Sequence, residues 1–118
     1  MEAVQSGQAS IFSFIYQVVG GLNGSPQYVS IPDLSYGYTK ILFSNVRNRH
    51  LLLVAIDGGY GGCLVAHTSD NTIENKGSSD AIVTNKNNEY TTNIYIEDYN
   101  IYVQTKASNV QNIRAWLY

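Results

Sequence analysis

The chain has 118 residues, 44% of them hydrophobic and 14% charged, with a formal net charge of −2. This length suffices for one folded core and is too short for two. Its few basic residues are scattered, apart from Arg47 and Arg49, and form no phosphate-binding patch, so a nucleic-acid partner is not expected. The longest apolar run, Leu51 to Ile56, is far shorter than the roughly 20 residues that span a bilayer, so membrane insertion is not expected either.

The beginning of the chain differs in character from the rest. Residues 1–9 are small and polar and predict a flexible segment or linker, whereas residues 10–118 read as a single domain. A first strand is predicted over residues 10–19 and a second over 27–32. The Gly, Asn, Ser and Pro residues between them are typical of a turn.

Two further strands are predicted over residues 39–46 and 50–57. The second is apolar on both faces, as expected of a strand in the middle of a sheet. A glycine-rich segment, residues 57–62, then leads into a strand at 63–68, so the pair predicts a hairpin. Because a strand and not a helix follows the glycines, this segment does not fit a phosphate-binding loop.

The remainder alternates between polar segments and short strands. Residues 69–80 predict a polar loop, and strands are expected at 81–84, 90–97, 101–106 and 110–118. The whole pattern predicts an all-β fold, an antiparallel, jelly-roll-like β-sandwich of about eight or nine strands. A single cysteine, Cys63, rules out an internal disulfide.

The last three strands alternate between aliphatic and aromatic or polar side chains. Ile94 and Ile96 point one way and Tyr95 the other, and the same alternation continues to the end of the chain. One interpretation is that the aromatic rings simply cover neighbours on a half-buried sheet. The other is that an aromatic face contacts a sugar or a second subunit. Its residues would be Tyr102, Trp116 and Tyr118.

Residues capable of catalysis are present but not arranged for it. Cys63 and His67 lie four residues apart on one strand, about 13 Å, too far for a nucleophile and its base. We expect Cys63 to be buried and inert. The acidic residues Glu89, Glu97 and Asp98 could supply the carboxylate pair of a glycoside hydrolase, but acids at strand ends are usually solvated. No enzymatic activity is expected.

Metal binding is also weakly supported by the sequence. Two histidines, one cysteine and isolated acids do not form a zinc or transition-metal ligand set. Calcium binding stays an open alternative if two loops meet, although the sequence lacks the closely spaced carboxylates of a calcium-binding loop. Its ligands would be Asp57, Asp70, Asn71 and Glu74. The sequence therefore predicts no cofactor, with calcium as the one exception left open.

The order of elements resembles the C-terminal tip domains of phage tail fibres and related receptor-binding proteins. The resemblance rests on LLLVAID, a glycine-rich hairpin and GCLVAHT, then DNTI, AIVTN and the closing NIYIEDYNIYVQTKASNVQNIRAWLY. It covers the chain from about Ser10 to the end. It implies a compact antiparallel sandwich that forms a homotrimer, belongs to a virion or lies outside the cell, and binds saccharide or protein on a host surface.

Three functions stay open at this point. The first is a recognition domain at a fibre tip, with contact residues in loops. The second is a monomeric carbohydrate-binding module or lectin that uses the aromatic face. The third is a structural domain that decorates a capsid or surface layer. For the first, the predicted contact residues are Asp57, Tyr60, Asp70, Asn71 and Tyr99.

Overall fold

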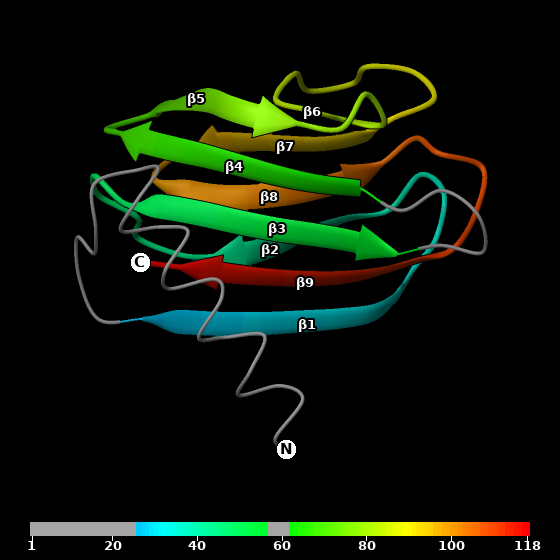
Figure 1. The fold of residues 1–118 in the computed structure, drawn as a ribbon, viewed down its shortest axis with the longest axis horizontal. Coiled ribbons are helices and arrows are strands. Elements are labelled where there is room, and N and C mark those ends of the chain that lie inside the picture. Colours follow the sequence, from blue (N-terminus) through cyan, green and yellow to red (C-terminus); the bar gives the residue numbers. More distant parts are fainter. Residues whose placement is uncertain (1–25, 57–61) are drawn as a thin grey trace.

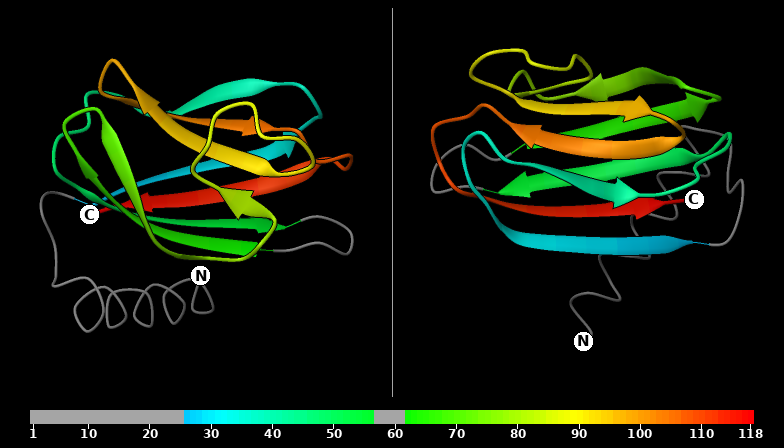
Figure 2. Two further views of the ribbon diagram at one scale, coloured as in Figure 1. Left: turned by 90° about the horizontal axis from the view of Figure 1, so that it is seen from above. Right: turned by 180° about the vertical axis from the view of Figure 1, so that it is seen from behind.

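The computed structural model describes residues 26–56 and 62–118, and the regular structure in these ranges consists of strands. The strands form two sheets that pack face to face (Figure 1, Figure 2). The predicted all-β sandwich is therefore confirmed. Within the described ranges no helix has the length and apolar character needed to cross a membrane.

The first sheet has five strands in the order β1-β9-β3-β4-β5, and its neighbouring strands run antiparallel. They are β1 Gln27–Leu34, β3 His50–Ile56, β4 Gly62–Ser69, β5 Thr72–Ser78 and β9 Gln111–Leu117. β3 lies in the middle, which confirms the prediction from its continuous apolar run. Leu51 and Leu53 point into the core, while Leu52 between them lies on the outer side of the sheet and is also buried.

The second sheet has four strands in the order β2-β8-β7-β6. They are β2 Thr39–Phe43, β6 Ile82–Val83, β7 Thr92–Glu97 and β8 Asn100–Thr105. β6 and β7 run parallel, so the prediction of a wholly antiparallel fold is wrong at this pair. Two parallel strands need a connection that brings the chain back to the end of the sheet where the first strand began. Residues 84–91 form this connection.

The pairing of the strands is partly that of a jelly roll. β1 pairs with β9 and β2 with β8, so early strands of the described chain pair with late ones. In contrast, β3, β4 and β5 form consecutive hairpins within one sheet. As a result, the two ends of the sandwich are built from different sets of connections.

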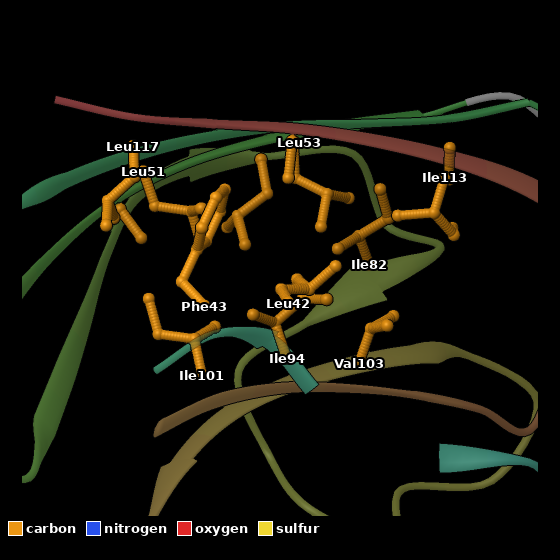
Figure 3. Close-up of a cluster of buried hydrophobic side chains, with 14 of the residues drawn as sticks. Leu42, Phe43, Leu51, Leu53, Ile82, Ile94, Ile101, Val103, Ile113 and Leu117 are labelled. Atoms are coloured by element: carbon orange, nitrogen blue, oxygen red, sulfur yellow. The ribbon is translucent and has the colours of Figure 1, made fainter. Parts of the chain in front are cut away.

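The core lies between the two sheets (Figure 3). In the second sheet Ile94 pairs with Val103 and Ile96 with Ile101, and all four are buried, as the alternation predicted. Opposite them lie buried residues of β3, β4 and β9, among them Leu53, Leu64, Ile113 and Leu117. This aliphatic core fixes the strand ends from which the connections project.

The predicted loop over residues 69–80 is wrong, because β5 occupies most of it. β5 is an edge strand that pairs in its sheet with β4 alone, and six of its seven residues are exposed. An edge strand without a buried face shows no apolar alternation in its sequence. Its backbone pairing could therefore not be read from side chains.

Several predictions concern residues outside the described ranges. They are the flexible segment 1–9, the strand over 10–19 and the hairpin tip that carries Asp57 and Tyr60. The hairpin itself is confirmed by its flanking strands, since β3 and β4 pair antiparallel up to Ala55 and Gly62.

Candidate functional site

Three connections meet at one end of the sandwich. They are residues 44–49 between β2 and β3, 70–71 between β4 and β5, and 98–99 between β7 and β8 (at the left in Figure 1). The backbone N–H of Tyr99 donates to Asn71 Oδ1 at 2.7 Å, and the N–H of Val46 donates to the Tyr99 carbonyl at 2.6 Å. We call residues 44–49, 70–71 and 98–99 the arginine end, after Arg47.

Tyr99 has an unusual backbone conformation. It follows Asp98 in a two-residue hairpin turn closed by the pair Glu97 and Asn100, with φ of 50° at Asp98 and 63° at Tyr99. Positive φ at both central positions is the requirement of a type I′ turn, which usually selects Asn and Gly. A bulky tyrosine there costs about 1–3 kcal/mol and persists only where its surroundings hold it. The contacts from Asn71 and Val46 do so.

Arg47 covers one face of the Tyr99 ring. Its guanidinium carbon lies 3.1 Å from the ring centroid, a cation–π contact that contributes about 0.5–1 kcal/mol at an exposed site. Within residues 26–56 and 62–118 Arg47 takes part in none of the three ion pairs. Stacking on the ring holds the planar guanidinium in place, and its N–H donors are not used by a carboxylate of the described chain.

Other polar residues of the arginine end also have positive φ. The values are 55° at Asn45, 49° at Asn48 and 51° at Asp70. Asn and Asp tolerate this conformation better than other residues with a side chain. The N–H of Asn45 donates to Asn100 Oδ1 at 3.2 Å, which ties loop 44–49 to β8. The end therefore presents exposed amide and carboxylate groups on fixed turns.

Two histidines lie beside this end, on β3 and β4. The rings of His50 and His67 are 5.0 Å apart, and His67 Nε2 lies 2.9 Å from Asn48 Oδ1. Burial, helped by the nearby charges of His67, Arg49 and Lys76, holds the pKa of His50 below its ordinary value. Within residues 26–56 and 62–118, neither ring is hydrogen-bonded to the hydroxyl of a serine or threonine or to the thiol of a cysteine.

Cys63 is exposed, so the prediction that it is buried is wrong. It pairs with Val54 near the start of β4, on the outer side of the first sheet. Its Sγ lies 4.0 Å from Ser79 Oγ. The hydrogen-bond partner of the His67 ring is Asn48 and not Cys63.

The structure brings together three of the five contact residues predicted from sequence. Asp70, Asn71 and Tyr99 all belong to the arginine end. Asp57 and Tyr60 lie outside the described residues. The strand ends that flank them, at Ile56 and Gly62, are at the opposite end of the sandwich from the 70–71 turn.

The alternative aromatic face does not form one surface. Tyr102 lies on the outer side of the second sheet, stacked on Tyr95 with ring centroids 5.2 Å apart. Trp116 lies on the outer side of the first sheet, 5.2 Å from the Tyr28 ring, and its Nε1 is buried without a hydrogen-bond partner among the described residues. Tyr118 is only 1% exposed, and burial raises its pKa. No single ligand can stack on all three rings.

Three residues of this end are not predicted as site residues from the sequence: Asn45, Arg47 and Asn48. The segment SNVRNR does carry a signal, because two asparagines flank a short stretch that joins two apolar strands. Asparagine in such a connection favours positive φ and a tight, ordered turn. The contact of Arg47 with Tyr99, 52 residues away in sequence, carries no local signal.

The four residues considered for calcium do not gather in the described part of the chain. Asp70 and Asn71 lie in the turn, where Asn71 Oδ1 already accepts the Tyr99 N–H. Glu74 lies on β5, with Oε1 3.0 Å from Lys76 Nζ. Over residues 26–56 and 62–118 no group of three or more His, Cys, Asp or Glu side chains is placed to hold a metal ion.

Comparison with known proteins gives a limited result. No family model matches the sequence, and no curated protein does. A crystal structure of the Acinetobacter phage vB_ApiP_P1 tailspike protein is similar with a TM-score of 0.47 and 12% identity, over 83% of this chain and 22% of the tailspike chain. The chain thus matches about a fifth of that protein's length. A similarity of this degree establishes neither a family nor a function.

Proposed function

We propose that the chain is a non-catalytic recognition domain that binds a saccharide on a host cell surface through the arginine end. The observation that carries the proposal is the position of Tyr99. It is held in a strained turn by Asn71 and Val46 and covered by Arg47. Strain maintained by contacts from two other connections is typical of residues kept for a function.

The chemistry of the arginine end suits a ligand rich in hydroxyl groups. Asn45, Asn48, Asp70, Asn71 and Asp98 are exposed and supply both hydrogen-bond donors and acceptors. Several are fixed by positive-φ turns, which lowers the entropy lost on binding. Polar groups held in place by ordered loops fix the orientation of a ligand and provide specificity.

Arg47 favours a saccharide that carries a carboxylate. Its guanidinium is held on the Tyr99 ring and is not paired with an acidic side chain of the described residues. A guanidinium binds a carboxylate through two parallel hydrogen bonds, which are stronger than neutral ones. Uronic and sialic acids are saccharides of this kind.

The setting of the domain follows the sequence resemblance to fibre-tip domains. We infer a homotrimer at the tip of a phage tail fibre, with the recognition loops directed at the host. Light scattering after size exclusion tests this directly, since one chain has a mass of 13.1 kDa and a trimer three times that. A monomer at micromolar concentration would overturn the trimer.

Binding to an array of neutral and acidic glycans tests the function. We expect acidic glycans to bind, and Arg47→Ala and Asn71→Ala each to weaken binding at least tenfold. Arg114→Ala is the matched control, because Arg114 is an exposed arginine on β9, away from the arginine end. Equal binding by the wild type and Arg47→Ala would reject this site. Cleavage of a bound glycan, seen by mass spectrometry, would reject the non-catalytic role.

A further inference from the structure

The opposite end of the second sheet presents tyrosine rings to solvent. Tyr36 is 56% exposed, Tyr38 63% and Tyr90 86%. They come from two connections, residues 35–38 between β1 and β2 and residues 84–91 between β6 and β7. Both connections lie at the right in Figure 1. We call Tyr36, Tyr38, Tyr90 and the ion pair described below the tyrosine end.

The first connection is a tight turn that fixes two of the tyrosines. Tyr38 N–H donates to the Ser35 carbonyl at 3.1 Å, and Gly37 between the tyrosines has φ of 85°. A type II turn requires positive φ at this position, and glycine provides it without strain. Gly37 N–H donates to the Thr105 carbonyl at 2.8 Å, and Thr105 N–H donates to the Tyr38 carbonyl at 3.1 Å. The turn is thus bonded to the end of β8.

The second connection is bonded to β8 from the other side. Lys106 N–H donates to the Thr91 carbonyl at 2.9 Å, directly after the residue that bonds Tyr38. Tyr38 and Thr91, the neighbour of Tyr90, therefore flank the end of β8, with their backbones about two strand spacings, or ~10 Å, apart. An oligosaccharide of a few sugar units is long enough to reach from one connection to the other.

The 84–91 connection is held by side-chain amides. Asn87 N–H donates to Gln104 Oε1 at 2.9 Å, Gln104 Nε2 donates to Asn87 Oδ1 at 2.9 Å, and Asn93 Nδ2 donates to the Asn88 carbonyl at 2.9 Å. Gln104 and Asn93 are buried. A satisfied buried polar network of this kind rigidifies the segment that carries Tyr90.

Tyr90 itself is kept in an unfavourable conformation. Its φ is 67°, although its side chain is almost fully exposed and gains little from packing. A bulky residue at positive φ costs about 1–3 kcal/mol. Asparagine or glycine would relieve that cost, so the tyrosine is not explained by stability.

Two opposite charges of this end form an ion pair. Lys106 Nζ lies 3.7 Å from Glu89 Oε1, and these residues adjoin Thr105 and Tyr90. Aromatic rings without net charge favour a neutral ligand with an apolar face and hydroxyl edges, and tyrosine offers large contact area at low entropic cost. Such a ligand differs from the one Arg47 favours at the other end.

We propose that the tyrosine end is a second binding site, for a neutral oligosaccharide whose sugar rings stack on Tyr38 and Tyr90. The site does not depend on the arginine end, and either one stands if the other fails. Both sites on one domain would let a single chain hold an extended glycan at two places, or two glycans of different charge.

The test uses the full chain and soluble maltohexaose, cellohexaose and N-acetylchitohexaose, with binding followed by calorimetry. At least one of these sugars should bind, and Tyr38→Ala and Tyr90→Ala should each weaken it at least fivefold. Tyr28→Ala is the matched control, because Tyr28 is 52% exposed on the outer side of the first sheet. Arg47→Ala should leave this binding unchanged.

Folding of each variant is checked by its melting temperature. The proposal is overturned if none of the three neutral sugars binds. It is also overturned if the wild type and the Tyr38→Ala/Tyr90→Ala double variant bind a sugar equally well. Loss of neutral-sugar binding in Arg47→Ala alone would assign the sugar to the arginine end and would overturn it as well.

Discussion

The arginine end and the tyrosine end are opposite ends of one β-sandwich but hold their side chains differently. At the arginine end three connections bond to one another, and the one tyrosine ring is covered by Arg47. At the tyrosine end the backbone is bonded to β8 while the rings stay exposed. The same sandwich therefore offers directional polar groups at one end and flat aromatic surface at the other, and the connections alone make the difference.

The largest expected effect should strike both ends together. Ile94 is fully buried between the sheets, so Ile94→Ala should lower the free energy of unfolding by about 2–5 kcal/mol and Ile94→Val by about 0.5–1.5 kcal/mol. Urea denaturation measures both. A loss below about 1 kcal/mol for Ile94→Ala would contradict the shared core as the support of the two ends.

A smaller effect should be confined to the arginine end. Asn71→Ala removes the acceptor of the Tyr99 N–H, a loss of about 0.5–1.5 kcal/mol for one hydrogen bond. Hydrogen exchange of the Tyr99 amide should accelerate, while that of Thr105 at the tyrosine end stays as it is. The exposed Asn109 provides the control Asn109→Ala. Equal acceleration at both ends would show that they are not independent.

Acid should lower the stability of the fold through His50, which lies beside the arginine end. The pKa of His50 is lowered by burial and nearby positive charge, so below its ordinary value of 6.5 the unfolded chain binds a proton that the folded chain resists. Stability from this group is therefore full above about pH 6.5 and falls as the pH drops toward the folded-state pKa. The melting temperature of the wild type should fall more between pH 7.5 and 5.5 than that of His50→Phe. An equal fall in the two proteins would remove His50 from this account.

The smallest effect should be a gain at the tyrosine end. Tyr90→Asn places a residue that tolerates positive φ at 67°, so stability should rise by a few tenths of a kcal/mol or, at most, about 1 kcal/mol. The melting temperature measures it. A drop of more than about 1 kcal/mol would mean that the Tyr90 ring stabilises the fold, and its exposure would then not indicate a ligand site.

Sequence patterns predicted the parts of the fold that bury a face. The alternation at Ile94 and Ile96 and the continuous apolar run of β3 both lead to the observed strands. β5 was not predicted, because its pairing depends on backbone groups and leaves most of its side chains in solvent. The parallel pair of β6 and β7 depends on the path of residues 84–91, which no local pattern encodes.

The candidate sites were predictable only in part, for a related reason. Asp70, Asn71 and Tyr99 stood out as turn residues, but their meeting is a property of the tertiary fold. The tyrosines at 36, 38 and 90 are ordinary in sequence, and only their exposure and the φ of Tyr90 distinguish them. Contacts between distant connections are set by strand order, which the sequence alone did not determine.

An NMR titration tests the central claim most directly, because it reports on every backbone amide of the chain at once. The probes are 3′-sialyllactose and trigalacturonic acid, with lactose as the neutral control. We predict that an acidic probe shifts the amide signals of residues 45–48, 70–71 and 98–100, and that Arg47→Ala abolishes these shifts. No shift in these residues at saturating concentrations of both acidic probes, or shifts that persist in Arg47→Ala, would contradict recognition at the arginine end.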